Sequence, residues 1–138
     1  MVEPIRGVRN RIGNAAHDYF FVEVIQIVFI DQPEPLGTGN AVFCALDWMV
    51  KNLSSSTDVL ILSGDVPLIS VDTITELSKK SNSILVNKVL NPKGYGRVEV
   101  DLETNLVKQI IEDKDCTLKQ KEIQLVNCGI YYFNLSVL

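Results

Sequence analysis

The chain has 138 residues, of which 46% are hydrophobic and 22% are charged, and its formal net charge is −4. This length and composition are typical of one globular domain that is large enough to bury a core. The acidic balance argues against general binding to nucleic acid, because phosphate binding that ignores sequence needs clustered lysine and arginine.

The first predicted element lies in the longest apolar run, Phe21–Ile30, which Glu23 and Gln26 interrupt. This run is shorter than the ~20 residues that cross a bilayer. We therefore expect Val24–Ile30 to be a buried strand and expect no membrane partner. No basic segment followed by an apolar block opens the chain, so the sequence indicates a cytoplasmic protein. The cysteines are widely separated and lack C-x-x-C spacing, which indicates neither a disulfide framework nor a structural zinc site.

A loop with two glycines comes next, followed by a helix that we expect to start near Asn40. From Ala41 to Val50 the apolar residues recur at helical spacing. A strand, a glycine loop and a helix in this order aim unpaired backbone N–H groups and the positive end of the helix at a ligand. A purely structural turn at Gly37–Gly39 is the alternative.

Two common nucleotide motifs do not fit this loop. A dinucleotide fingerprint would need a third glycine where Val42 stands, and no acidic residue follows the next strand at the required distance. A phosphate loop would need Gly-Lys-Ser/Thr, which is absent between Gly37 and Ala41. The loop therefore has to be interpreted together with the motifs that follow it.

Asn52–Asp58 is predicted to be a polar loop. The apolar strand after it ends abruptly in Ser63-Gly64-Asp65, and its continuous apolar pattern is typical of a strand covered on both faces in a parallel sheet. Ser70 is a good N-cap for a second helix that carries Val71, Ile74 and Leu77 on one face. The order of strand, helix, strand and helix predicts a parallel α/β sheet.

The second half of the chain is predicted to be an antiparallel addition to this sheet. Arg97–Asp101 alternates apolar and polar residues, as a half-exposed strand does. We expect a further helix to begin at Asn134. The remaining expected elements are strands at Ser83–Leu90, Leu106–Glu112 and Leu125–Phe133 and turns at Asn91–Gly96 and Leu102–Asn105.

Five motifs follow one another along the chain: Gln32 with Leu36–Ala41, Gly64–Ile69, Asn91–Val98, Ile111–Asp115 and Asn127–Ile130. This series resembles the sugar-nucleotide pyrophosphorylases, and within them the uridyltransferase domain of the bacterial bifunctional enzymes that act on N-acetylglucosamine 1-phosphate. The resemblance covers about Gln32 to the last residue. It implies a Rossmann-like three-layer α/β nucleotidyltransferase fold with a mixed sheet, present as one partial domain over 1–138. Residues 1–80 would be the nucleotide-binding half and residues 81–138 the antiparallel, sugar-binding half.

The resemblance also implies a reaction and a set of site residues. UTP and N-acetylglucosamine 1-phosphate would form UDP-N-acetylglucosamine and pyrophosphate, with Mg²⁺ as cofactor. Asp65 would be the catalytic residue and the metal ligand, since a carboxylate is the hard oxygen donor that Mg²⁺ prefers. The implied nucleotide-binding residues are Gln32, Gly37, Thr38, Ser63, Gly64 and Asp65, and the implied sugar-binding residues are Gly96, Glu112 and Asn127.

The chain departs from the family pattern at several places. Pro35 and Asn40 stand where close relatives usually carry glutamine and histidine, and Ser63 stands where a tyrosine is common. We expect the family's N-terminal glycine-rich loop and lysine, and a second metal ligand, to lie outside this chain. Two alternatives therefore stay open beside the enzyme: an inert nucleotide-sugar binding domain, and a pyrophosphorylase for another sugar nucleotide. Assembly into a homo-oligomer is also left open.

Overall fold

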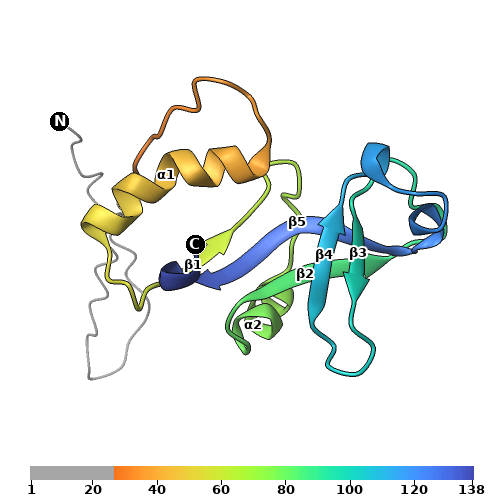
Figure 1. The fold of residues 1–138 in the computed structure, drawn as a ribbon. Helices are drawn as coiled ribbons and strands as arrows, with labels where there is room; N and C mark the ends of the chain where they lie inside the picture. Colours follow the sequence, from red (N-terminus) through yellow and green to blue (C-terminus); the bar gives the residue numbers. More distant parts are fainter. Residues whose placement is uncertain (1–26) are drawn as a thin grey trace, which may run out of the picture. The chain divides into compact units, whose positions relative to one another are not determined.

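The structure is a computed structural model that describes residues 27–138. The chain divides into two compact units, and the boundary between them follows Ala45. Figure 1 shows the elements along the chain: α1 (Thr38–Asn52), β1 (Asp58–Ile61), α2 (Val71–Ser78), β2 (Ser83–Lys88), β3 (Arg97–Val100), β4 (Val107–Ile111), the 3-10 helices η1 (Asp113–Asp115) and η2 (Gln120–Glu122), β5 (Leu125–Asn134) and η3 (Leu135–Val137).

The segment before α1 differs from the prediction. Ile27–Ile30 is not a strand, and Phe29 within it is 90% exposed. A strand forms only where its backbone N–H and C=O groups find a neighbouring strand. No pairing is recorded for this segment among residues 27–138. The predicted buried strand is therefore wrong for Ile27–Ile30, and its first part, Val24–Gln26, lies outside the described residues.

Helix α1 confirms the helical spacing of the sequence. It begins two residues before the predicted Asn40, directly after Gly37, whose φ is +99°. Its apolar stripe is half-buried at Val42 and Met49, and no residue of the helix is fully buried. The polar loop predicted at Asn52–Asp58 is confirmed, because β1 starts at the end of it.

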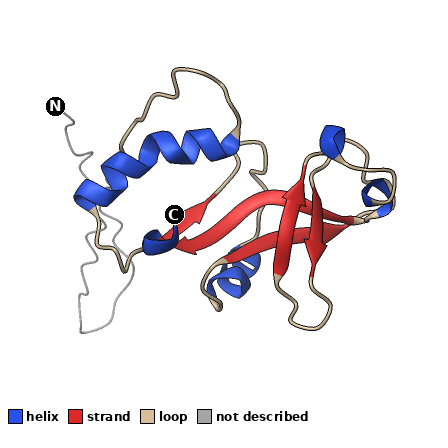
Figure 2. Cartoon of the chain, viewed as in Figure 1, coloured by secondary structure: helices blue, strands red, loops and turns tan. Residues whose placement is uncertain are grey.

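The second unit contains a five-stranded sheet in which every recorded pair is antiparallel (Figure 2). Strands β1, β2 and β3 all pair with β5, and β4 pairs with β3. The predicted antiparallel half is confirmed. The expectation that the strand before Ser63 has parallel neighbours is not met in the part of the chain that the structure describes. There, β1 pairs antiparallel with β5 and is half-buried rather than covered on both faces.

Helix α2 begins as predicted. The Ser70 side chain accepts a hydrogen bond of 3.1 Å from the Thr73 N–H group, which satisfies one of the unpaired donors in the first turn. The helix packs against β2 and β5 and buries Leu77, whereas Val71 is exposed. The other buried apolar side chains are Val98, Val126, Ile130 and Leu135. Each contributes about 1.5–3 kcal/mol through removal of its apolar surface from water.

Strand β3 departs from simple alternation, because Arg97 and Val98 are both buried. The prediction of a half-exposed strand is therefore wrong at Arg97. A charged side chain can be buried where an opposite charge pairs with it, and the carboxylate of Asp113 lies 2.7 Å from the Arg97 guanidinium.

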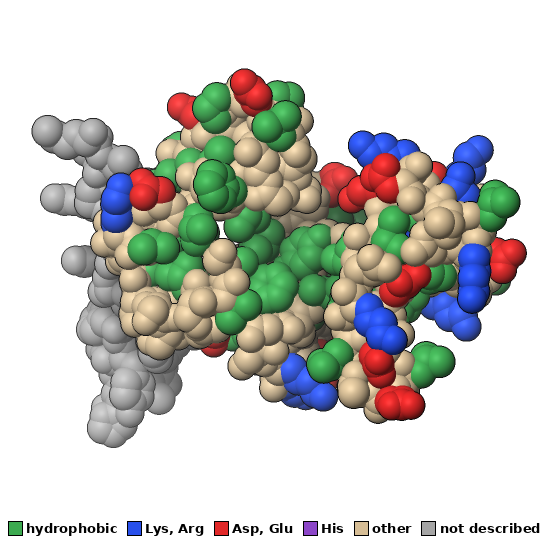
Figure 3. Space-filling view, in the orientation of Figure 1, with side chains coloured by type: hydrophobic (Ala, Val, Ile, Leu, Met, Phe, Trp, Pro, Cys, Tyr) green, Lys and Arg blue, Asp and Glu red, His purple; other side chains and the backbone are tan. Residues whose placement is uncertain are grey.

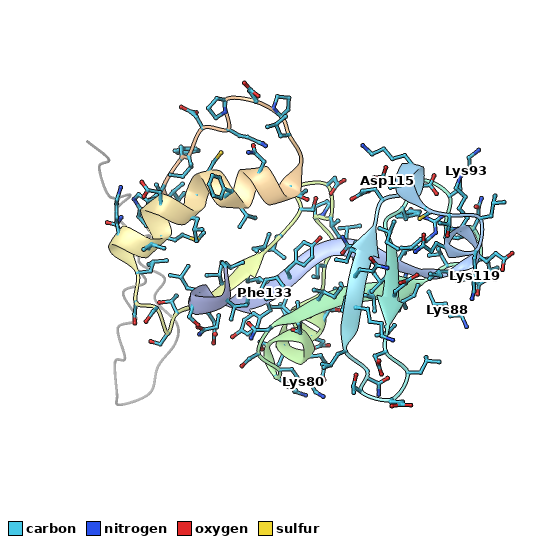
Figure 4. All side chains as sticks on the ribbon, viewed as in Figure 1. Lys80, Lys88, Lys93, Asp115, Lys119 and Phe133 are labelled. Atoms are coloured by element: carbon cyan, nitrogen blue, oxygen red, sulfur yellow. The ribbon has the colours of Figure 1, made fainter. Side chains whose placement is uncertain are left out.

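The surface of the second unit is uneven in charge. Figure 3 shows acidic and basic side chains gathered over the end of the sheet that carries β3, β4, η1 and η2. Figure 4 places Lys93, Asp115 and Lys119 at this end. None of the helices described for residues 27–138 combines the length and the apolar character that crossing a membrane requires.

Candidate functional site

The glycine loop of the first unit is held by Gln32. The side-chain Nε2 of Gln32 donates to the Gly37 carbonyl oxygen at 3.1 Å and to Oδ1 of Asn40 at 2.8 Å. Gly37 has a φ in the region that favours glycine, and a Cβ placed on it would meet nothing within 4 Å. Thr38 then starts α1, so its N–H group is among those without an intrahelical acceptor. Of the predicted nucleotide-binding residues in this unit, Gln32 and Gly37 are therefore hydrogen-bonded to each other, and Thr38 directly follows Gly37.

Asn40 has a role that the sequence analysis missed. It was noted only as a departure from the family pattern, yet its side-chain oxygen accepts from Gln32 and also lies 4.0 Å from the Cys44 sulfur. The spacing of Asn40 and Cys44, one helical turn apart, is the signal that could have indicated the second contact. The hydrogen bond from Gln32 crosses a loop and has no such signal.

The Ser63–Asp65 segment follows the end of β1, where the sequence placed it. The Ser63 hydroxyl donates to Oδ1 of Asp65 at 2.6 Å. The Val66 N–H group donates to the Ser63 carbonyl oxygen at 3.2 Å and closes the turn that contains Gly64. Asp65 is exposed, so its carboxylate can reach a ligand in solvent. The structure thus holds the carboxylate by one hydroxyl at the end of a strand.

The three predicted sugar-binding residues come together in the second unit. The Asn127 N–H group donates to the Gly96 carbonyl oxygen at 2.9 Å. A Cβ placed on Gly96 would lie 3.7 Å from Cβ of Asn127 and 3.8 Å from Oε2 of Glu112. Gly96 lies in the turn before β3, Glu112 directly follows β4, and Asn127 lies near the start of β5. Gly96 and Asn127, 31 positions apart in the sequence, therefore lie together with Glu112 around one point of the second unit.

A glycine in β5 connects this group to the Ser63–Asp65 segment. Gly129 has a φ of +70°, and a Cβ placed on it would lie 3.6 Å from Cβ of Ser63. Its N–H group donates to Oδ1 of Asn127 at 3.1 Å. An isolated glycine inside a strand is a signal of close backbone approach, but the sequence analysis did not place Gly129 in the site. Ser63, whose hydroxyl contacts the Asp65 carboxylate, thus lies beside Gly129 of β5, two residues along the strand from Asn127.

The amide of Asn127 has a defined orientation. Its Nδ2 donates to the Tyr131 hydroxyl at 2.6 Å, and its Oδ1 accepts from Gly129. An amide nitrogen carries two hydrogens, so one N–H of Asn127 remains available for a ligand. Tyr131 was also missed by the sequence analysis, although residues four apart on a strand share a face.

Burial raises the pKa of the Cys128 thiol, which stands between Asn127 and Gly129. The thiol therefore remains neutral at neutral pH and adds no charge beside the site. The charged side chains next to Gly96 and Glu112 in the sequence are Arg97 and Asp113, which form an ion pair with each other.

Asp65 is the residue predicted to hold a metal ion at this site. No group of three or more histidine, cysteine, aspartate or glutamate side chains that could hold a metal occurs between residues 27 and 138. Mg²⁺ in phosphate-transfer sites is often held by one or two carboxylates, with waters and substrate phosphates as further ligands. An exposed carboxylate held by the Ser63 hydroxyl is compatible with that mode of binding.

Comparison with known proteins gives matches over most of the chain. Residues 6–138 match the family described as "Nucleotidyl transferase". A protein of Acanthamoeba polyphaga mimivirus named "Probable UDP-N-acetylglucosamine pyrophosphorylase" is 44% identical over 119 residues, which are 82% of this chain and 45% of that protein. The "Bifunctional protein GlmU" of Trichodesmium erythraeum is 41% identical over 116 residues, or 80% of this chain and 24% of that protein. The chain therefore spans less than half the length of these relatives.

Proposed function

This chain belongs to the nucleotidyl transferase family, and on that premise we propose that it forms UDP-N-acetylglucosamine and pyrophosphate from UTP and N-acetylglucosamine 1-phosphate. Membership in the family confirms the predicted α/β nucleotidyltransferase fold class. The choice of uracil and of N-acetylglucosamine, the Mg²⁺ ion, a cytoplasmic location and the assignment of halves 1–80 and 81–138 are parts of the proposal.

The observation that carries this proposal is the convergence of polar groups along β5. Gly96, Glu112 and Asn127 surround one space, and Gly129 brings the Ser63–Asp65 segment to the same strand. A few converging polar groups beside a carboxylate are typical of a site for a polar small molecule. A sugar phosphate next to a nucleotide phosphate fits that order of groups.

The proposed reaction is a displacement at phosphorus. A phosphate oxygen of the sugar 1-phosphate forms a bond to the α-phosphorus of UTP, and the bond from that phosphorus to the pyrophosphate oxygen breaks. The protein contributes mainly position and charge neutralisation to such a step. A Mg²⁺ ion held by Asp65 would supply positive charge for the phosphates. The Ser63 hydroxyl keeps the Asp65 carboxylate in one orientation.

The sugar would be held by three different kinds of group. The Glu112 carboxylate accepts hydrogen bonds from sugar hydroxyls, and the free N–H of Asn127 donates to a sugar oxygen. Gly96 lacks a side chain, which leaves the sugar ring room to approach the backbone between the other two residues. In the first unit, Gly37 would offer its open backbone to a flat base, and Gln32 shapes the loop that carries it.

Pyrophosphate release tests the proposal directly. The full 138-residue chain is mixed with UTP, N-acetylglucosamine 1-phosphate and Mg²⁺, and the rate is compared with that of Asp65→Asn and Asp72→Asn. Asp72 is a matched control because it is also exposed and lies in the first turn of α2. We expect Asp65→Asn to lower the rate by about 100-fold or more and Asp72→Asn to leave it unchanged.

Three outcomes would count against the proposal. Equal rates for Asp65→Asn and the unmodified chain would remove Asp65 from the catalytic site. Binding of UDP-N-acetylglucosamine without any pyrophosphate release would instead favour the inert binding domain. Release of pyrophosphate with another sugar 1-phosphate, and none with N-acetylglucosamine 1-phosphate, would show that the substrate is a different sugar phosphate.

A further inference from the structure

The most deeply buried charge among the described residues has no role in the proposed chemistry. Arg97 is only 2% exposed, and its Nη2 lies 2.7 Å from Oδ1 of Asp113, which is 31% exposed. Its Nη1 donates to the Tyr95 carbonyl oxygen. Burial of a guanidinium costs several kcal/mol unless the charge is paired and hydrogen-bonded.

The ion pair joins the two segments that carry the predicted sugar residues. Arg97 directly follows Gly96, and Asp113 directly follows Glu112. Arg97 lies opposite Ile111 of β4 and opposite Val126 of β5. The pair therefore links the position directly after Gly96 to the position directly after Glu112, and β3 links both to β5, which carries Asn127.

Asp113 also holds the turn before β3. Its carboxylate accepts from Arg97, and this hydrogen bond is the largest cause that lowers the pKa of Asp113. The same guanidinium donates to the Tyr95 carbonyl oxygen in the turn. The turn is closed further by the Tyr95 N–H group, which donates to the Pro92 carbonyl oxygen at 3.1 Å. The two charges thus set where the backbone passes at Gly96.

Stability alone is a poor reason for such an arrangement. Buried ion pairs can often be replaced by apolar residues at no cost in stability. Moreover, the Nε atom of Arg97 is buried without a hydrogen-bond partner among residues 27–138, which costs about 1–3 kcal/mol for a buried donor. Directional hydrogen bonds, in contrast, fix a defined geometry between their partners, and an apolar pair does not.

We propose that Arg97 and Asp113 are positioning residues for the sugar side of the site and act by fixing Gly96 against Glu112 and Asn127. This inference rests on the proposed function, because Gly96, Glu112 and Asn127 are taken to contact the sugar. Neither Arg97 nor Asp113 contacts the ligand. Their loss should therefore affect a ligand that carries the sugar and spare one that does not.

The test compares the affinities of UDP-N-acetylglucosamine and UDP for the full chain by isothermal titration calorimetry with Mg²⁺ present. Asp113→Asn keeps the size of the side chain but removes the charge that pairs with Arg97. We expect Asp113→Asn to lower the affinity for UDP-N-acetylglucosamine about tenfold, which is the loss expected for one hydrogen bond to a charged group. The affinity for UDP should stay within about twofold of that of the unmodified chain. Asp113→Glu, which keeps the charge, should recover part of the loss.

Lys108→Ala is the matched control. It removes the exposed ion pair between Lys108 and Asp101, 3.0 Å long, on the same β3–β4 hairpin. An exposed pair of this kind contributes little, so both affinities should stay unchanged. A loss in Lys108→Ala equal to that in Asp113→Asn would overturn the proposal, since any disturbance of the hairpin would then suffice.

The remaining outcomes separate the two proposals. If the unmodified chain binds UDP-N-acetylglucosamine and Asp113→Asn binds it equally well, the positioning role is overturned and the proposed function stands. Equal losses for UDP and UDP-N-acetylglucosamine, or loss of the folded state in both Asp113 variants, would assign the pair to stability and overturn the positioning role. Failure of the unmodified chain to bind either ligand would overturn the proposed function and the positioning role with it.

Discussion

Replacement of Gly96 by alanine should affect the affinity for the ligand without lowering the free energy of unfolding. The added Cβ would lie 3.4 Å from Cγ2 of Ile110, 3.7 Å from Cβ of Asn127 and 3.8 Å from Oε2 of Glu112. These are ordinary van der Waals distances, so the methyl group fits the folded state without a clash. Alanine also reduces the conformational freedom of the unfolded chain, which is worth about 0.4–1 kcal/mol.

We therefore expect Gly96→Ala to leave the free energy of unfolding unchanged or to raise it by up to about 1 kcal/mol. The same methyl group occupies space between Asn127 and Glu112 that the proposed sugar needs. Overpacking of a close-fitting space costs about 1–3 kcal/mol, which raises the dissociation constant for UDP-N-acetylglucosamine about fivefold or more. Urea unfolding measures the first quantity and calorimetric titration the second.

Gly94→Ala is the control for this experiment. Gly94 has a φ of +87° and nothing within 4 Å of an added Cβ, so alanine there is strained but does not fill the site. It should lose about 1–2 kcal/mol of stability and retain its affinity for the sugar nucleotide. The reasoning is refuted if Gly96→Ala is destabilised as much as Gly94→Ala, or if it binds UDP-N-acetylglucosamine as tightly as the unmodified chain.

Three further predictions concern stability. Ser70→Ala removes the cap on the Thr73 N–H group and should lower the free energy of unfolding by about 0.5–2 kcal/mol in urea titration; an unchanged midpoint would contradict the capping role. Ile130→Ala empties a site that is 0% exposed and should cost about 2–5 kcal/mol in the same assay, and a loss below about 1 kcal/mol would contradict its place in the core. The hydrogen bond from Arg97 lowers the pKa of Asp113 in the folded state, so ionised Asp113 stabilises the fold above its ordinary pKa, and this stability is lost as the pH falls through the lower, folded pKa. When the melting temperature is measured against pH, Asp113→Asn should therefore lose less stability than the unmodified chain below about pH 4. Identical acid profiles for the two proteins would refute this.

Local signals predicted most of the elements in the described part of the chain. Ser70 marked the start of α2, and turn residues at Asn91–Gly96 separated β2 from β3. Such signals act within a few residues and do not depend on the rest of the fold. The direction of pairing is different, because a short apolar run fits a parallel or an antiparallel neighbour equally well. For this reason β1 was expected in a parallel sheet, yet it pairs antiparallel with β5.

The candidate site was predicted as a set of residues but not as an arrangement. The order of motifs indicated Gly96, Glu112 and Asn127, and the structure brings these three together, while their roles stay predictions. The burial of Arg97 could not be predicted, since a lone arginine in an alternating strand is normally exposed. Its partner, Asp113, is 16 residues away and belongs to no local pattern.

The position of β5 in the sheet has a consequence for how the chain folds. Strands β1, β2 and β3 come earlier in the sequence and all pair with this later strand, and Asp58 of β1 contacts Asn134 across 76 residues. Pairing over such separations slows folding, because a long loop must close before any contact forms. During synthesis, the edges of the earlier strands stay unpaired until β5 leaves the ribosome, and unpaired edges promote aggregation. The strand that carries Asn127 is therefore also the one whose arrival pairs the edges that β1, β2 and β3 leave free for it.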